Sequence, residues 1–144
     1  MNLAQQQMKV DLVTANEERA MDVNDYQIGG KHYQKEYQHW DMVCDTLMPY
    51  LLGCATKYIT RWRDKNGVED LRKAAHYIAK AEENAVFMVK VKSINENIVR
   101  FSKQLEPKES QIFIAICNGQ YDQAQTLISE LIGIELEKSE YTKG

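Results

Sequence analysis

Three basic residues stand four positions apart near the middle of the chain, and their side chains could neutralise the phosphates of a ligand. Lys57, Arg61 and Lys65 would form one stripe on an α-helix, because residues four apart share a helix face. Guanidinium groups offer a planar fork to oxyanions, and ammonium groups offer a compact charge. Three further bases are close in sequence: Arg63, Arg72 and Lys73. On charge alone, a solvated face paired with nearby carboxylates explains the stripe better than a binding site does.

Aromatic residues beside the stripe add a second kind of chemistry. Tyr58 and Trp62 could stack on a nucleobase, since every base offers a π-face. A position in the core is the better explanation for Trp62. The tyrosine therefore remains the stronger candidate for contact with a base.

A glycine-containing loop earlier in the chain could close such a site. Gly29 and Gly30 allow positive φ angles and bring backbone N–H groups close to a ligand, and Lys31, His32 and Tyr33 follow them directly. Taken alone, a Gly-Gly pair is better explained by a plain turn.

Several kinds of catalytic centre are missing from the sequence. There is no GxxxxGK[ST] phosphate loop, and no serine or cysteine lies in a nucleophile motif. A magnesium cage on one helix face needs carboxylates three or four positions apart. Glu69-Asp70 and Glu82-Glu83 are adjacent pairs on one predicted helix, so they do not build such a cage. The histidines and cysteines have no familiar ligand spacing. We therefore expect neither a metal nor a cofactor.

The charge of the 144-residue chain is uneven. Its net charge is −3, yet residues 31–80 carry nine bases and six acids. An anionic partner would meet this middle segment, and the modest excess fits a small phosphorylated ligand better than long nucleic acid. No apolar run approaches the roughly 18 residues of a membrane helix. Three cysteines without CxxC spacing indicate reduced, buried thiols in a cytosolic protein.

Helical periodicity dominates the remainder of the chain. Trp40 to Leu47 predicts a short helix, and a second helix should follow Pro49 and run to about Arg63. Asn66-Gly67 marks a turn, after which a long helix begins at Val68, with no Gly or Pro before Pro107. Small apolar residues on that helix favour antiparallel packing against the preceding one.

The segment Ala85–Val89 is apolar on all sides, so we expect it in an oligomer interface or under the C-terminal extension; a short β-strand is the competing interpretation. Pro107 should open a separate unit, in which helices over Glu109–Cys117 and Tyr121–Ile132 form an αα-hairpin that ends at Gly133. The expected organisation is a mobile arm (1–24), a compact all-α core built on a central helical hairpin (25–106), a C-terminal hairpin (107–134) and a frayed tail (135–144).

These motifs, in this order, resemble the SaV-like family of small bacteriophage proteins, in which one characterised member is a nucleotide kinase without a phosphate loop. The resemblance covers about residues 25–83. It rests on two sets of residues. The first set is Asp25, Gln27, Ile28, Gly29, Gly30, His32 and Tyr33. The second set is Gly53, Lys57, Tyr58, Arg61, Lys65, Gly67, Glu69, Asp70, Leu71, Lys73, Ala74, His76 and Tyr77. One departure is Cys54, where the family usually has an asparagine; the thiol lacks the donor and acceptor of an amide.

The resemblance implies an all-helical fold, a phage origin, assembly into homo-oligomers and nucleotide binding in the cytoplasm of the infected host. On this basis we expect Lys57, Arg61 and Lys65 to neutralise phosphate, with Lys73 reaching in from the facing helix. Lys31, His32 and Tyr33 would close the pocket, and Tyr58 or Tyr77 would contact the base. Gly29, Gly30 and Gly53 would support the site, and Asp70 would orient Arg61 or Lys57.

Three functions remain open at this point. The first is sequestration of nucleotides, for example the cyclic or modified nucleotides that signal in host immunity. The second is a nucleoside monophosphate kinase, as the resemblance implies. The third is a structural interaction protein with a merely solvated basic face. The missing metal cage and Cys54 favour binding without turnover.

Overall fold

A computed structural model describes residues 36–143 of the chain. This part is built of helices and contains no strand, which confirms the expected all-α fold. The helices are α2 (His39–Thr46), α3 (Tyr50–Arg61), α4 (Val68–Glu83), α5 (Lys92–Ser102), α6 (Pro107–Cys117) and α7 (Tyr121–Lys143). Within residues 36–143, none of the helices combines the length and the apolar character that crossing a membrane requires.

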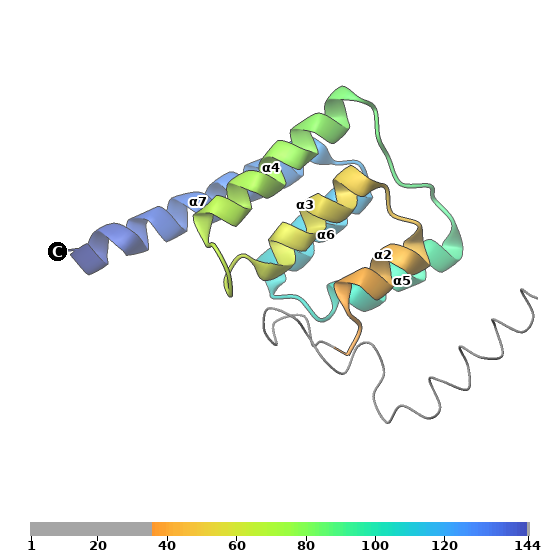
Figure 1. The fold of residues 1–144 in the computed structure, drawn as a ribbon, viewed down its shortest axis with the longest axis horizontal. Coiled ribbons are helices and arrows are strands. Elements are labelled where there is room, and N and C mark those ends of the chain that lie inside the picture. Colours follow the sequence, from red (N-terminus) through yellow and green to blue (C-terminus); the bar gives the residue numbers. More distant parts are fainter. Residues whose placement is uncertain (1–35, 144) are drawn as a thin grey trace, which may run out of the picture. The chain divides into compact units, whose positions relative to one another are not determined.

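The helices form two layers (Figure 1). α2, α3 and α4 make one layer, and behind them α5 packs on α2, α6 on α3 and α7 on α4. We expected Pro107 to open a separate unit, but the two helices that follow it supply most of the second layer. The C-terminal helices therefore complete the core that α3 and α4 begin.

The α3–α4 hairpin is the central element, because these two helices make the most extensive contact in the described part. Each contributes a stripe of buried side chains at helical spacing: Leu52, Ala55 and Ile59 from α3, and Leu71, Ala74, Ile78 and Ala81 from α4. The alanines let the two backbones approach closely. Between the helices, Gly67 has a φ of 57°, a conformation in which glycine avoids the steric cost of a side chain.

Helix α2 lies where the sequence predicts it, but its buried face differs from the apolar stripe in the sequence. Leu47 is largely exposed and Trp40 is about half exposed, whereas Met42 and Thr46 are buried. Leu47 ends the helix in a left-handed conformation, with a φ of 51°. Helical spacing thus predicted the element correctly without identifying the side that packs.

The expected long helix from Val68 to Pro107 is wrong, because α4 ends at Glu83. Asn84 follows, and Ala85 then adopts a left-handed φ of 52°, which turns the chain out of the helix. Residues 86–91 run without regular structure to α5. Phe87 stacks on Tyr121 of α7, with ring centroids 5.4 Å apart, and the Tyr121 hydroxyl donates to the carbonyl of Val86. This segment therefore lies against the C-terminal helices, although Phe87 itself stays half exposed.

Helix α7 also differs from expectation, since it continues through Gly133 to Lys143. Glycine inside a helix costs about 1 kcal/mol but does not by itself end the helix. By contrast, α6 ends at Cys117 as predicted, and Gly119 follows it with a φ of 73°. The last turns of α7 extend past α4 (Figure 1). Ile134 and Leu136, in the second half of α7, are exposed.

All three cysteines are free thiols, but they differ in exposure. Cys44 is exposed, Cys54 is half-buried and Cys117 is buried. Burial raises the pKa of the Cys117 thiol to about 12. The expectation that all three thiols are buried is therefore wrong for Cys44.

Candidate functional site

The turn between α3 and α4 is held by one buried carboxylate. Asp70, in the first turn of α4, has no exposure to solvent. Arg61 donates to it from Nε at 3.3 Å and from Nη2 at 3.4 Å, and Asn66 donates from its backbone N–H and its side-chain amide at 3.3 Å each. Both carboxylate oxygens are satisfied in this way, at the end of a helix where negative charge is favoured. Asp70 therefore fixes Arg61 and the turn together.

Two tyrosines extend this network along the hairpin. The Arg61 guanidinium lies 4.6 Å from the ring centroid of Tyr58 on α3. Tyr58 stacks on Tyr77 of α4, with centroids 5.8 Å apart and an angle of 22° between the rings. Tyr50 meets Tyr77 edge to face at 6.5 Å. A row of aromatic rings thus joins α3 to α4 on one face of the hairpin.

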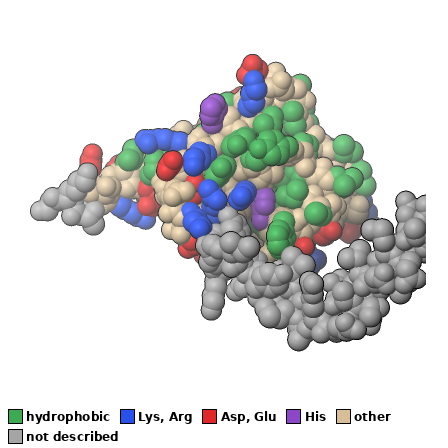
Figure 2. Space-filling model, viewed as in Figure 1, with side chains coloured by type: hydrophobic (Ala, Val, Ile, Leu, Met, Phe, Trp, Pro, Cys, Tyr) green, Lys and Arg blue, Asp and Glu red, His purple; other side chains and the backbone are tan. Residues whose placement is uncertain are grey.

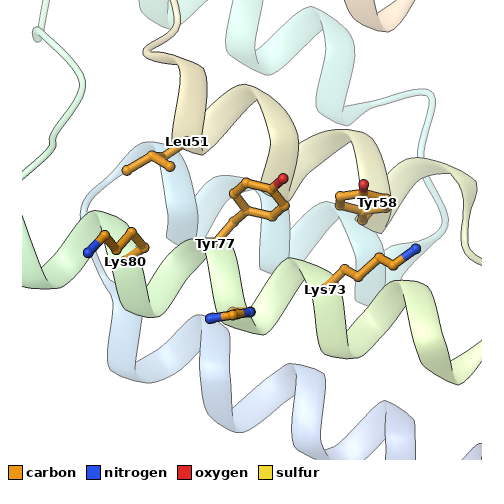
Figure 3. A pocket seen from close by; sticks show the side chains of 6 residues that line it. Leu51, Tyr58, Lys73, Tyr77 and Lys80 are labelled. Carbon is orange, nitrogen blue, oxygen red and sulfur yellow. The ribbon is translucent and has the colours of Figure 1, made fainter.

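A pocket of about 360 Å³ opens beside the stacked tyrosines (Figure 3). Its lining comes from both helices of the hairpin: Leu51 and Tyr58 from α3, and Lys73, His76, Tyr77 and Lys80 from α4. The four α4 residues have the spacing i, i+3, i+4 and i+7, which places them on one helix face. None of the described residues that line the pocket is acidic. The pocket thus combines aromatic surface with positive charge, the chemistry that a nucleobase and a phosphate require.

Of the residues predicted for the site, the structure brings Tyr58, Lys73 and Tyr77 together in the pocket. The Lys73 ammonium lies 5.6 Å from the Tyr58 ring centroid and 3.5 Å from a carboxylate oxygen of Glu69. Arg61 is close to them through its contact with Tyr58, but it does not line the pocket.

Lys57 and Lys65 do not line the pocket either. α3 ends at Arg61, so Lys65 lies in the turn, and the predicted stripe of three bases on one helix is corrected to two. Lys57 is exposed and lies near His39 of α2, whose imidazole Nε2 lies 2.8 Å from the Thr56 hydroxyl. Burial, together with the Lys57 charge, lowers the pKa of His39 to about 4.

Arg63 has a structural partner outside the pocket. Its Nη2 donates to Glu109 of α6 at 3.1 Å, and its guanidinium lies 4.4 Å from the ring centroid of Trp62. Trp62 is buried, as expected. These contacts tie the hairpin to the second layer.

Sequence reasoning left three pocket residues out of the predicted site: Leu51, His76 and Lys80. The signal for the last two was available, because they lie three and seven positions after Lys73 and therefore share its helix face. Leu51 carried no such signal, since its spacing is equally that of a core residue. It is half-buried and forms an apolar wall.

The departure at Cys54 lies close to the aromatic row. Hydrogen bonding and charge interaction with the Cys54 thiol, and then interaction with Tyr77, raise the pKa of the Tyr50 phenol. A Cβ added to Gly53 would meet Val43 at 3.9 Å, an ordinary contact, so sterics do not require glycine there. The loop residues Gly29, Gly30, Lys31, His32 and Tyr33 lie outside the described residues.

Most of the basic side chains and the apolar surface occupy different parts of the hairpin face. Figure 2 shows Lys and Arg side chains gathered where α3 and α4 are joined, and hydrophobic side chains over the other half. The exposed hydrophobic residues of α2, α3 and the loop between them are Trp40, Leu47 and Tyr50. Within residues 36–143, no group of three or more His, Cys, Asp and Glu side chains could hold a metal ion.

Comparison with known proteins gives one match. A family model described as a protein of unknown function (DUF3310) matches residues 29–79. The match spans α2, α3 and most of α4, which is fewer than half of the residues of the chain, and its description assigns no activity. No curated protein matches the chain, and no solved structure does.

Proposed function

We propose that this protein binds a nucleotide in the pocket beside the α3–α4 hairpin. The observation that carries the proposal is the stacked pair Tyr58 and Tyr77 in a pocket that also receives Lys73 and Lys80 (Figure 3). Base–aromatic stacking contributes about 1–3 kcal/mol per base, whichever base is bound. The lysines supply charge-assisted hydrogen bonds to phosphate oxygens.

Arg61 has a supporting role in this proposal. Its guanidinium is engaged by Asp70 and lies against Tyr58, so it holds the tyrosine and the turn in position. We assign phosphate binding to Lys73 and Lys80, and we keep Lys57 and Lys65 as part of a positive surface that attracts the ligand. That Lys31, His32 and Tyr33 close the site stays a prediction from the sequence alone.

The resemblance to small phage proteins supports a biological setting for nucleotide binding. In that setting the protein acts in the cytoplasm of an infected host and sequesters nucleotides, such as the cyclic or modified nucleotides of immune signalling. Cys54 in place of an asparagine favours retention of the ligand over its turnover. A nucleoside monophosphate kinase is the alternative that uses the same pocket.

The test is to incubate the purified chain with a nucleotide panel, recover what it retains and identify it by mass spectrometry. We expect unchanged nucleotide to be retained by the natural chain, retained in smaller amount by Lys73→Gln and lost in Tyr77→Ala. Tyr141→Ala is the matched control, because this tyrosine is 89% exposed on α7. The side chain of Lys73 is 40% exposed, so Lys73→Gln keeps the proposal testable if Tyr77→Ala does not fold.

The outcomes separate the functions. Conversion of a monophosphate to a diphosphate, with ATP present, would identify a kinase and overturn sequestration. If no nucleotide in the panel is retained by the folded chain, nucleotide binding itself is wrong, and an interaction protein with a solvated basic face becomes the better account.

A further inference from the structure

Lys73 and Lys80 mark the two ends of the pocket. They lie seven residues apart on α4, on one face of the helix, and the rise of 1.5 Å per residue separates their Cα atoms by about 10 Å along the axis. In Figure 3 their side chains diverge, one toward Tyr58 and the other beyond Leu51, with Tyr77 between them. The positive charge of the pocket is therefore divided between two ends.

The middle of the pocket has a different character. Tyr77 and Leu51 are half-buried there and offer aromatic and apolar surface. A ligand that uses the whole pocket would place an uncharged part against these residues and an anionic group at each end. A ligand with all of its charge in one place would use only one lysine.

Each lysine currently pairs with an acid on its own helix. Lys73 lies 3.5 Å from Glu69, and Lys80 lies 3.7 Å from Glu83. All four of these side chains are at least 40% exposed. Exposed pairs of this kind contribute little to stability, so a phosphate can take the place of either carboxylate.

We propose that the preferred ligand is a nucleotide with two phosphate groups held apart from each other. This inference rests on the proposed function and narrows its ligand class. The same chemistry occurs in a nucleoside 3′,5′-bisphosphate and in a cyclic dinucleotide. A nucleoside 5′-diphosphate has comparable charge, but its two phosphates are adjacent.

The test is calorimetric titration of the full chain with adenosine and guanosine compounds of each kind: the 5′-monophosphate, the 5′-diphosphate, the 3′,5′-bisphosphate and the cyclic dinucleotide. We expect at least one ligand with separated phosphates to bind about tenfold more tightly than the 5′-diphosphate of the same base, the gain typical of one extra charged hydrogen bond. Whichever of the 3′,5′-bisphosphate and the cyclic dinucleotide binds more tightly is the kind of ligand that fits the pocket.

Two substitutions locate the effect. Lys73→Gln and Lys80→Gln should each remove the preference, so that the affinity ratio of the separated to the adjacent phosphates falls from about ten to about one. Lys108→Gln is the matched control, because this lysine is similarly exposed on α6 and pairs with Glu130. It should leave the ratio unchanged.

The result that would overturn the inference is equal affinity for separated and adjacent phosphates in the natural chain. A preference that survives Lys80→Gln would overturn it as well. In both cases nucleotide binding itself would stand. If the natural chain binds none of these compounds and retains nothing from the wider panel, the proposed function fails instead.

Discussion

Arg61 differs from the other basic residues near the hairpin turn, because it bonds to a carboxylate that has no exposure to solvent. Removing one partner of a buried ion pair leaves the other charge uncompensated, which costs about 3–5 kcal/mol. We therefore predict that Arg61→Ala lowers the free energy of unfolding by about 3 kcal/mol. Urea denaturation followed by circular dichroism measures this loss.

Arg72→Ala provides the comparison for that prediction. Arg72 is exposed on α4, so its removal should change the free energy of unfolding by less than about 0.5 kcal/mol. Loss of nucleotide binding in Arg61→Ala without any loss of stability would show that Arg61 is a ligand-binding residue and not a positioning residue.

His39 links stability to pH. Its pKa is about 4 in the folded chain and about 6.5 when unfolded, so the unfolded chain binds the proton more readily. Neutral His39 therefore makes its full contribution to the free energy of unfolding above pH 6.5, and this contribution is lost as the pH falls toward 4. The full difference amounts to about 3 kcal/mol.

We predict that His39→Gln flattens the pH dependence of the free energy of unfolding between pH 6.5 and pH 4. Glutamine cannot take up the proton and can still hydrogen-bond to the Thr56 hydroxyl. Thermal denaturation across this range measures the slope, with His76→Gln as an exposed histidine control. An identical slope in the natural chain and in His39→Gln would contradict the assignment.

The candidate site was only partly predictable from residue types. Tyr58, Lys73 and Tyr77 were expected and do share the pocket. Lys57 and Lys65 were expected and do not line the pocket. Helical spacing predicts which residues share a stripe, but it does not predict which stripe borders a pocket. The pocket depends on how two helices pack, and the types of individual residues do not predict that packing.

The boundary between α4 and α5 shows what periodicity can miss at the scale of an element. Helix ends are usually recognised by Gly or Pro, and neither occurs there. Ala85 instead adopts the left-handed conformation, which costs a non-glycine residue roughly 1–2 kcal/mol. The stacking of Phe87 on Tyr121 is the compensating contact, and it involves a residue 34 positions away along the chain. Tertiary packing therefore sets this boundary.

This interpretation predicts that an alanine-to-glycine substitution changes the free energy of unfolding in opposite directions at two positions. Ala85→Gly should raise the free energy of unfolding by about 0.5–1 kcal/mol, because glycine adopts a positive φ without steric cost. Ala79→Gly, on the exposed face of α4, should lower it by about 1 kcal/mol. Chemical denaturation of both variants measures the pair, and a loss in Ala85→Gly would contradict the left-handed assignment.

For the described residues together, the all-α class and the central hairpin were predictable, because a period of 3.6 persists through most of the chain. The arrangement of these helices in two layers was not predictable from the sequence. Which helix covers which depends on contacts such as Arg63 with Glu109, and these join residues 46 positions apart. The sequence pattern indicates which face of each helix is apolar. Which of these faces pack against each other depends on the contacts among all of the described helices.

The three free thiols form a built-in series of probes for local opening. They lie on α2, α3 and α6, and they range from the exposed Cys44 through Cys54 to the buried Cys117. A thiol reagent reaches a buried sulfur only when its surroundings open, so the rate of modification reports the free energy of that opening. Alkylation kinetics resolved by peptide mass spectrometry would therefore compare the stability of the two helix layers in the natural chain. Retained nucleotide should slow the reaction at Cys54, which lies beside the aromatic row, more than at Cys44.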